Sequence, residues 1–267
     1  MKLFTDLAAS IRSPSRWLFS TWFLFLIRYR RTSIGPLWIV ATPIMFIGFL
    51  GALFVGLSNL STSVFIPHMT IGFICWTLLG GFLGRSSSLY SRNKAMMMQG
   101  ETRHTDVILL DISELVVHFL HQAILILAVC LFYKTIKGPY ALFSLLGLLV
   151  VILNGFWFTI VVSIIGARFN DVSQLMGSVT SILFLATPII WMPTTEPGGV
   201  VGSRGNILEV YMNFNPFYHF LEIIRAPLMN NPVAPLTLIV IGTITVLGFA
   251  LAAFVYSRYR HMVVLWS

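Results

Sequence analysis

Six apolar runs, each close to the roughly 20 residues that an α-helix needs to cross a bilayer, dominate this chain of 267 residues. They cover residues 34–57, 67–89, 112–132, 142–165, 173–191 and 233–256. Because 57% of the residues are hydrophobic and only 10% are charged, little sequence remains for a soluble domain. The sequence therefore predicts an all-α integral membrane protein in which residues 1–267 form a single transmembrane domain.

Basic residues at the ends of the apolar runs indicate the orientation of the chain. Arg28, Arg30 and Arg31 precede the first run, and arginine is costly in hydrocarbon, so we expect a cytoplasmic N-terminus without a cleaved signal peptide. An even number of spans returns the C-terminus to the cytoplasm. This topology places 13 of the 17 Lys and Arg residues inside and four outside, with Lys134 and Lys137 as a local exception. The net charge of +8 then requires no nucleic-acid partner.

Two further segments have helical patterns but are too short or too broken to span. Residues 13–31 open with a Ser-Pro helix start and contain an apolar core with aromatic residues, which predicts an amphipathic interfacial helix; a frayed basic tail is the alternative. Residues 192–232 are apolar but interrupted by Pro and Gly, which is typical of short re-entrant helices on the outer side. Within them, the spacing of Glu222 and Arg225 predicts an ion pair.

The connection of residues 91–111, on the cytoplasmic side, is long enough to bind a soluble partner. It combines both charge signs with three consecutive methionines, Met96 to Met98, a composition that suits an adaptable protein surface. A docking surface and a plain solvated loop are both consistent with this pattern.

Four ionisable residues share one face of the third predicted span: Asp111, Glu114, His118 and His121. The last three have a spacing that three metal ligands on a helix can have. The alternative is that the carboxylates lie at the cytoplasmic mouth while the histidines face neighbouring helices or a wet cavity. Spacing alone does not separate these interpretations, and we assign no metal site.

Several motifs of chemistry are missing from the sequence. There is no G-x-x-x-x-G-K-[ST] loop for nucleotide phosphates, and no G-x-S-x-G, H-E-x-x-H or C-x-x-C motif. Cys75 and Cys130 lie inside apolar runs without a paired spacing, so no disulfide is expected. The chain is therefore not expected to be an enzyme or to hydrolyse ATP by itself.

The junction before the first span resembles a known family. Residues 28–38 read Arg-Tyr-Arg-Arg-Thr-Ser-Ile-Gly-Pro-Leu-Trp and are similar to the R-Y-[RK]-x-S-x-L-G-x-x-W motif of type-2 ABC exporter permeases for polysaccharides, which export O-antigen, capsule or teichoic acid. Thr32 and Ile34 replace the usual Ser and Leu, and the Phe-Pro pair of many members is missing from residues 99–105. The landmarks to which we assign structural roles are Gly35, Trp38, Pro43, Asn215, Pro216 and Arg225.

This resemblance implies a half-transporter in the bacterial inner membrane. A second copy and two separate ATP-binding-cassette subunits would complete it; those subunits would bind ATP and Mg, so no cofactor is expected in this chain. The cargo would be a glycan on a polyprenyl diphosphate lipid, with O-antigen as the first expectation and capsule or teichoic acid next.

The same resemblance suggests three sets of functional residues. Docking of the ATP-binding subunits is assigned to Met97, Met98, Gln99, Gly100, Glu101, Thr102, Arg103 and His104. The lipid diphosphate would be attracted by Arg28, Arg30 and Arg31, which also fit a role as topology anchors. The aromatic residues expected to stack on sugar rings near the outer exit are Trp191, Tyr211, Phe214 and Tyr218.

Two other functions compete with this interpretation. One is a membrane enzyme of lipid-linked sugar metabolism that uses Asp106, Asp111, Glu114 and the two histidines. The other is a drug or lipid exporter of the same fold, which would differ in its cargo.

Overall fold

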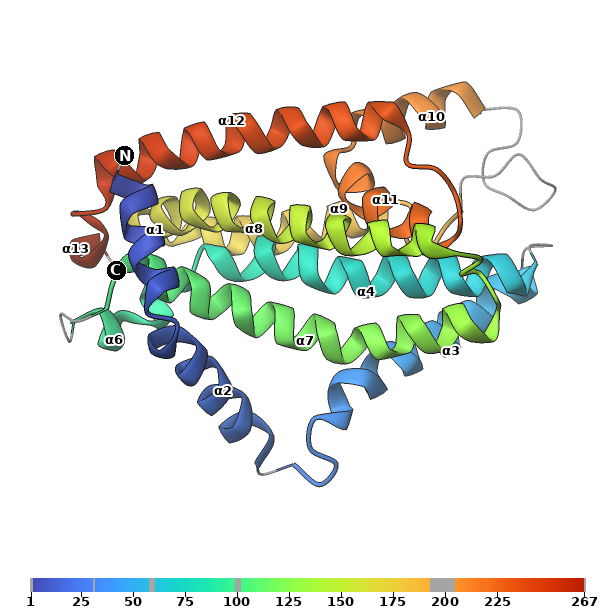
Figure 1. The fold of residues 1–267 in the computed structure, drawn as a ribbon, viewed down its shortest axis with the longest axis horizontal. Helices are drawn as coiled ribbons and strands as arrows, with labels where there is room; N and C mark the ends of the chain where they lie inside the picture. The colour runs from blue at the N-terminus through green and yellow to red at the C-terminus, as the bar shows by residue number, and fades with distance from the viewer. Residues whose placement is uncertain (1, 31, 58–60, 99–101, 193–204, 267) are drawn as a thin grey trace.

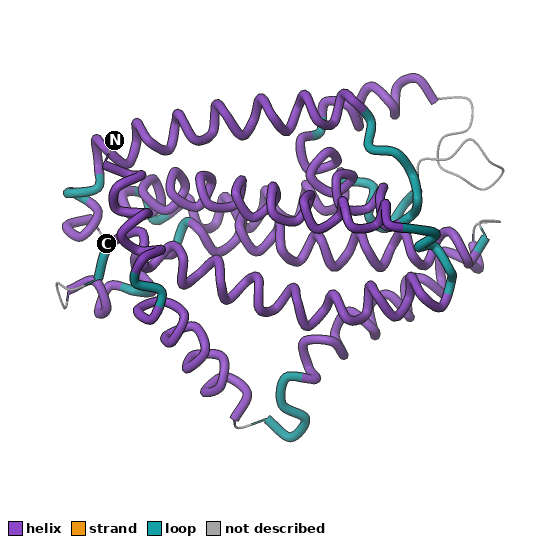
Figure 2. The backbone as a smooth tube through the Cα atoms, viewed as in Figure 1, coloured by secondary structure: helices purple, strands orange, loops and turns teal. Residues whose placement is uncertain are grey.

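A computed structural model describes residues 2–30, 32–57, 61–98, 102–192 and 205–266, and all regular structure in these ranges is helical (Figures 1 and 2). The elements are α1 (Lys2–Arg12), α2 (Ser15–Arg30), α3 (Leu37–Leu57), α4 (Thr62–Ser86), α5 (Leu89–Arg92), α6 (Lys94–Met98), α7 (His104–Phe132), the 3-10 turn η1 (Pro139–Leu142), α8 (Phe143–Arg168), α9 (Asp171–Ala186), α10 (Gly205–Phe214), α11 (Pro216–Leu228), α12 (Pro235–Tyr259) and α13 (Val263–Trp266).

The long helices run side by side along the longest axis of the molecule (Figure 1). The two termini lie at one end, together with α1, α6 and α13, whereas α10 and α11 lie at the other end. Among the described residues, five segments are long and apolar enough to cross a membrane, namely Leu37–Gly56, Thr62–Ser86, His104–Phe132, Pro139–Arg168 and Pro235–Tyr259. The prediction of an all-helical integral membrane protein is confirmed.

The fifth predicted span, residues 173–191, corresponds to α9, which has only 16 residues. At 1.5 Å per residue it is about 24 Å long, shorter than the hydrocarbon core of roughly 30 Å. Its end has a local cause. Thr187 precedes Pro188, whose ring disfavours helical geometry in the residue before it, and Thr187 is extended with ψ 139°.

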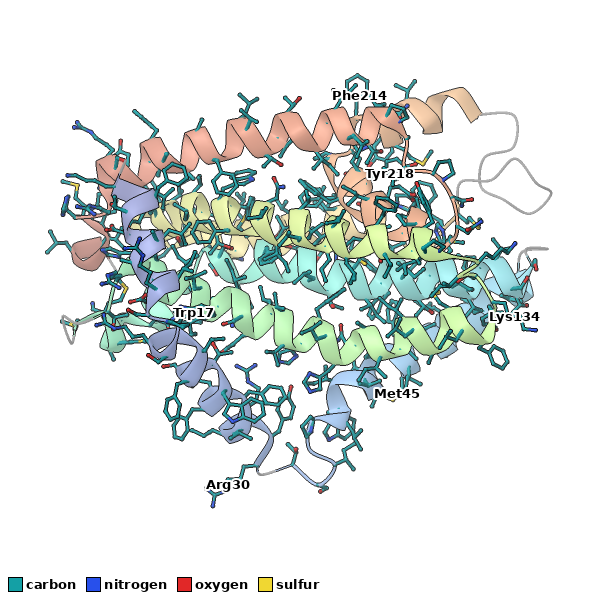
Figure 3. The ribbon with its side chains drawn as sticks, in the orientation of Figure 1. Trp17, Arg30, Met45, Lys134, Phe214 and Tyr218 are labelled. Carbon is teal, nitrogen blue, oxygen red and sulfur yellow. The ribbon has the colours of Figure 1, made fainter. Side chains whose placement is uncertain are left out.

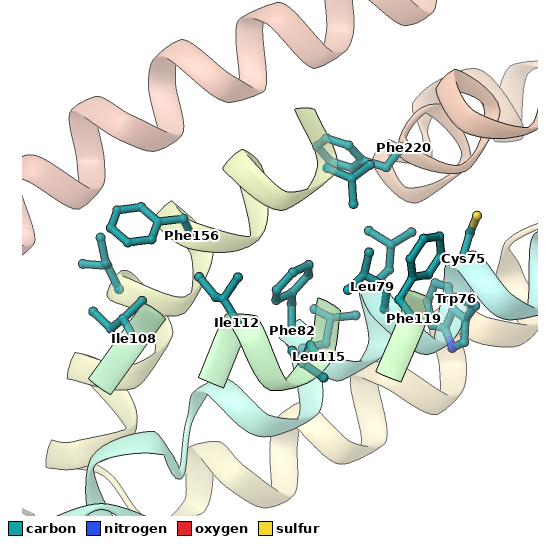
Figure 4. Close-up of a cluster of buried hydrophobic side chains, with 14 of the residues drawn as sticks. Cys75, Trp76, Leu79, Phe82, Ile108, Ile112, Leu115, Phe119, Phe156 and Phe220 are labelled. Atoms are coloured by element: carbon teal, nitrogen blue, oxygen red, sulfur yellow. The ribbon is translucent and has the colours of Figure 1, made fainter. Parts of the chain in front are cut away.

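Helix α4 is the centre of the bundle. In its most apolar window 67% of the residues are buried, against 17% in α12, so most of the apolar surface of α12 lies on the outside of the bundle. The core between α4, α7 and α8 contains Leu79, Phe82, Leu115, Phe119 and Phe156 (Figure 4). The packing of α7 and α8 around α4 brings the polar side chains of α4 and α7 close to one another.

Helix α1 was not predicted from the sequence. It packs on the end of the bundle that holds both termini. Asp6 accepts hydrogen bonds from the Tyr256 hydroxyl (2.9 Å) and from Arg260 Nη1 (2.7 Å) of the last long helix and its C-terminal cap. The buried Ser10 and Thr105 hydroxyls are 2.7 Å apart. This helix therefore ties the start of the chain to its end and to α7.

Residues 91–111, expected to be one connection, consist mainly of helix. They include α6, and α7 begins at His104, about two turns before the predicted span. The backbone N–H of Arg103 donates to Asp106 Oδ2 at 3.0 Å, which satisfies a free donor at the start of α7. The carboxylates of α7 are thereby held in regular helix.

Candidate functional site

A cluster of charged side chains joins α2, α4 and α7 near the end of the bundle that holds the termini. Arg85, in the last turn of α4, donates from Nη2 to Asp111 Oδ1 and to Glu114 Oε2, both at 2.7 Å. Arg92 Nη2 also binds Asp111 Oδ1, at 3.0 Å, and Arg28 Nη2 on α2 binds Glu114 Oε2 at 3.2 Å. Three guanidinium groups thus face two buried carboxylates.

The balance of charge in this cluster is positive. The Asp111 and Glu114 side chains are 3% and 7% exposed, whereas that of Arg28 is 44% exposed. Burial lowers the pKa of Arg92, and the neighbouring Asp111 opposes that shift. Each carboxylate is paired with at least two guanidinium groups, and the Arg28 side chain remains partly exposed.

A cavity of about 280 Å³ lies beside the cluster, between the same three helices. Its lining residues are Arg28, Thr77, Gly81, Arg85, Leu115, His118 and Gln122. Two of the lining side chains, those of Arg28 and Arg85, are cationic. Arg85 Nε is buried and has no hydrogen-bond partner in the part of the chain that the structure describes. The cavity is thus suited to an anionic group.

The two histidines of α7 have separate roles. His118 Nε2 accepts a hydrogen bond from Arg28 Nη1 at 3.1 Å, and its ring lies edge-on to Phe25. His121 Nδ1 is 2.7 Å from the carbonyl oxygen of Val117 in its own helix. Among the described residues, no three His, Cys, Asp or Glu side chains are grouped so that they could hold a metal ion.

Gln122 also lines the cavity, and the sequence alone did not indicate a role for it. Pro43 lacks a backbone N–H and leaves the carbonyl of Ile39, one turn earlier in α3, without its helical partner. Gln122 Nε2 donates to that carbonyl at 3.3 Å, while Gln122 Oε1 accepts from the Thr77 hydroxyl at 2.6 Å. One amide thus joins α3, α4 and α7 at the proline.

The predicted junction residues form the turn between α2 and α3. Gly35 has φ +57°, a conformation that costs little in glycine and more in other residues. Trp38 is 47% exposed at the start of α3, and Arg30 points away from the bundle (Figure 3). Arg31 lies outside the described residues. The glycine therefore reverses the chain, and Arg28 is the headgroup candidate that the structure places in the cavity.

The second landmark holds α11 in place at the opposite end. Asn215 caps α11, because its Oδ1 accepts from Phe217 N at 3.0 Å, and Pro216 occupies the first helical position. Asn215 Nδ2 also donates to Thr187 Oγ1 at 3.1 Å, just after α9. These contacts agree with a structural role for the Asn-Pro pair.

Arg225 is 2% exposed and makes the densest polar contact of α11. It pairs with Glu222, as the spacing predicted, through Nε (2.7 Å) and Nη2. Its Nη1 donates to His68 Nε2 of α4 at 3.0 Å and to the Pro188 carbonyl at 2.7 Å. Arg225 therefore joins α4, α11 and the segment that follows α9.

The aromatic residues expected along a glycan pathway are spread over several elements. Trp191 follows α9, and its indole N–H donates to the Leu185 carbonyl at 3.0 Å. Tyr211 and Phe214 belong to α10 and are 47% and 84% exposed, and Tyr218 lies on α11 (Figure 3). Phe214 has the free face that stacking requires, whereas Trp191 is partly engaged with its own backbone.

The candidate docking residues are exposed to different degrees. Met98 is 68% exposed, Met97 is buried, and Thr102 and Arg103 are half-buried. His104 packs edge-on against the rings of Tyr90 and Tyr256. Gln99, Gly100 and Glu101 lie outside the described residues. The described part of the predicted surface is therefore narrower than the sequence suggested and is centred on Met98.

The model of a family described as "ABC-2 type transporter" matches residues 16–229, which is more than half of the chain and includes both landmarks. No curated protein matches the sequence.

Proposed function

The chain belongs to the ABC-2 type transporter family, and on this premise we propose that it is the permease half of an exporter for a lipid-linked polysaccharide. As the membrane component of such a transporter it is a transport subunit and not an enzyme. The alternative of a membrane enzyme that uses Asp106, Asp111 and Glu114 is therefore wrong. Permeases of this family typically work with ATP-binding subunits.

The observation that carries the proposed cargo is the cavity that Arg28 and Arg85 line together. A polyprenyl diphosphate places a strongly charged group at the membrane boundary, and guanidinium groups bind phosphate through paired hydrogen bonds. Arg28 and Arg85 line the cavity, and Arg30 is exposed at the end of α2, the helix that carries Arg28. We propose that Arg28, Arg30 and Arg31 attract the diphosphate, with O-antigen as the first glycan to test and capsule or teichoic acid next.

The assembly that we propose contains two copies of this chain and two ATP-binding subunits, which bind ATP and Mg. The subunits dock around Met98 and along residues 97–104. The end of the bundle that holds α1, α6 and both termini faces the cytoplasm, and the bundle spans the bacterial inner membrane. The aromatic residues Trp191, Tyr211, Phe214 and Tyr218 lie on the glycan pathway toward the opposite side.

Reconstitution tests this proposal. The tagged chain is co-expressed with a candidate ATP-binding subunit, purified and placed in vesicles, and export of a polyprenyl-diphosphate glycan is measured with and without ATP. We expect the subunit to be retained and ATP hydrolysis to rise with the lipid-linked glycan but not with the free glycan. Absence of both retention and ATP-dependent export with every candidate subunit would overturn the proposal.

A pair of charge variants separates headgroup attraction from general charge. Arg30→Gln removes an exposed cation two residues after Arg28 on α2, whereas Lys134→Gln removes an exposed cation at the opposite end of the bundle (Figure 3). We expect Arg30→Gln to raise the lipid-linked glycan concentration needed for half-maximal ATP hydrolysis, and Lys134→Gln to leave it unchanged. Equal behaviour of the two variants would leave the arginines as topology anchors.

A further inference from the structure

One cavity lies where helices α2 and α3 contact the central helices of the bundle. On α2, Arg28 binds Glu114 at 3.2 Å, and the Thr21 hydroxyl is 2.7 Å from that of Ser113. On α3, the Ile39 carbonyl accepts the hydrogen bond from Gln122, a cavity-lining residue. A ligand in the cavity would therefore meet the side chains that hold α2 and α3 against α7.

Two of the guanidinium groups share the carboxylate of Glu114, which precedes the cavity-lining Leu115 in α7. Arg28 Nη2 and Arg85 Nη2 both donate to one oxygen of Glu114, Oε2, at 3.2 and 2.7 Å. A phosphate ester offers several oxygens and can give each guanidinium its own acceptor. The buried Arg85 Nε, without a partner in the described chain, is a further donor for such an anion.

We propose that this cavity binds a phosphate-ester anion, that Glu114 occupies its place at Arg28 in the empty state, and that binding releases α2 from α7. Asp111 stays with Arg85 and Arg92, so those groups remain paired when Glu114 is displaced. The proposal rests on the proposed function, because it takes the diphosphate of the cargo lipid as the natural source of the phosphate group.

The structure makes this exchange easy at Arg28 and hard at Arg85. The Arg28 side chain is 44% exposed, and ion pairs open to water are weak. The side chain of Arg85 is 27% exposed and has two carboxylate partners. The phosphate would therefore take Arg28 from Glu114 while Arg85 stays fixed to α7, and the Arg28–Glu114 ion pair between α2 and α7 opens.

Binding to the purified chain in nanodiscs tests the site without any transport. The probes are inorganic pyrophosphate, an isoprenyl diphosphate and the uncharged isoprenol, measured by calorimetry on the wild type, Arg28→Gln, Glu114→Gln and the distant control Lys134→Gln. We expect Arg28→Gln to weaken diphosphate binding roughly tenfold. Glu114→Gln should strengthen it about twofold to fivefold, because the competing charge is gone.

Amide hydrogen exchange of α2 measures the release. We expect the diphosphate probe to speed exchange in α2 of the wild type, and Glu114→Gln to speed it without any probe. Binding of both probes would show that the phosphate group suffices, and binding of the isoprenyl diphosphate alone would assign the source to a lipid headgroup.

Three results would overturn the inference: neither diphosphate binds, binding is equal in the wild type, Arg28→Gln and Glu114→Gln, or binding leaves α2 exchange unchanged. Glu114→Gln keeps the side-chain shape, so the inference stays testable even if Arg28→Gln fails to fold. None of these measurements needs an ATP-binding subunit or a glycan, so a failure of this inference can be distinguished from a failure of the proposed function.

Discussion

Replacing Arg225 by methionine should be among the most destabilising single changes in this chain. Arg225 is 2% exposed and donates to Glu222, to His68 and to the Pro188 carbonyl. The variant Arg225→Met keeps much of the volume but removes every donor. Breaking a buried ion pair typically costs about 3–5 kcal/mol, and the 21% exposure of the Glu222 side chain favours the lower figure of about 3 kcal/mol.

The assay is thermal unfolding of the purified chain in a mild detergent. A loss of about 3 kcal/mol corresponds to a fall in Tm on the order of 6–12 °C for a chain of this size. The control Arg30→Met removes an exposed arginine and should change Tm by little.

A second substitution isolates the charge effect at Arg225. Glu222→Gln added to Arg225→Met should recover part of the lost Tm, because the partly buried carboxylate of Glu222 is then no longer left without its partner. The reasoning is refuted if Arg225→Met melts with Arg30→Met, or if the double variant shows the full sum of the two single losses.

Two further predictions concern the turn and the proline near the cavity. Gly35→Ala should cost about 1–2 kcal/mol of unfolding free energy, because φ is +57° and the added methyl group meets nothing within 4 Å that would add a packing effect; Gly35→Asn should cost less, and equal stability of all three chains would contradict this. Gln122→Leu should cost about 1–3 kcal/mol, because the Ile39 carbonyl loses its donor. Adding Pro43→Ala should recover much of that loss through the backbone N–H gained at position 43; no recovery in thermal unfolding would rule out the pairing.

The apolar runs predicted the helices well where burial and propensity act together, and less well where one side chain decides. Runs of roughly 20 apolar residues leave few alternatives to helix, since backbone groups in hydrocarbon must bond within the segment. The shorter α9 depends on Pro188 and on contacts with Asn215 that lie far away in sequence. Helix α1 is polar enough to resemble a tail, and its partners Tyr256 and Arg260 come from the other end of the chain.

The candidate site was predictable in part. Helical spacing placed Asp111, Glu114 and His118 on one face of α7, and the structure brings the three residues to one cluster. The spacing alone did not indicate which residues of other helices would bind them. Arg85 lies near the cytoplasmic end of the predicted run 67–89, as topology-marking arginines do, and the structure instead directs its guanidinium toward α7. The packing of α4 against α7 shows that Arg85 is an ion-pair partner of the α7 carboxylates, a role that the sequence does not separate from topology marking.

The landmarks that identify the family mostly perform backbone tasks. Gly35 allows a left-handed turn, Pro43 frees a carbonyl, and Asn215 caps a helix. Any cargo moved by this fold would need these features, so they mark the scaffold rather than the substrate. We therefore expect the choice of cargo to depend on side chains at a cavity that meet no backbone requirement, such as Arg28, which lines the cavity, and Glu114, which pairs with Arg28 at 3.2 Å. For this reason binding measured at that pair tests the cargo more directly than any change in the landmarks.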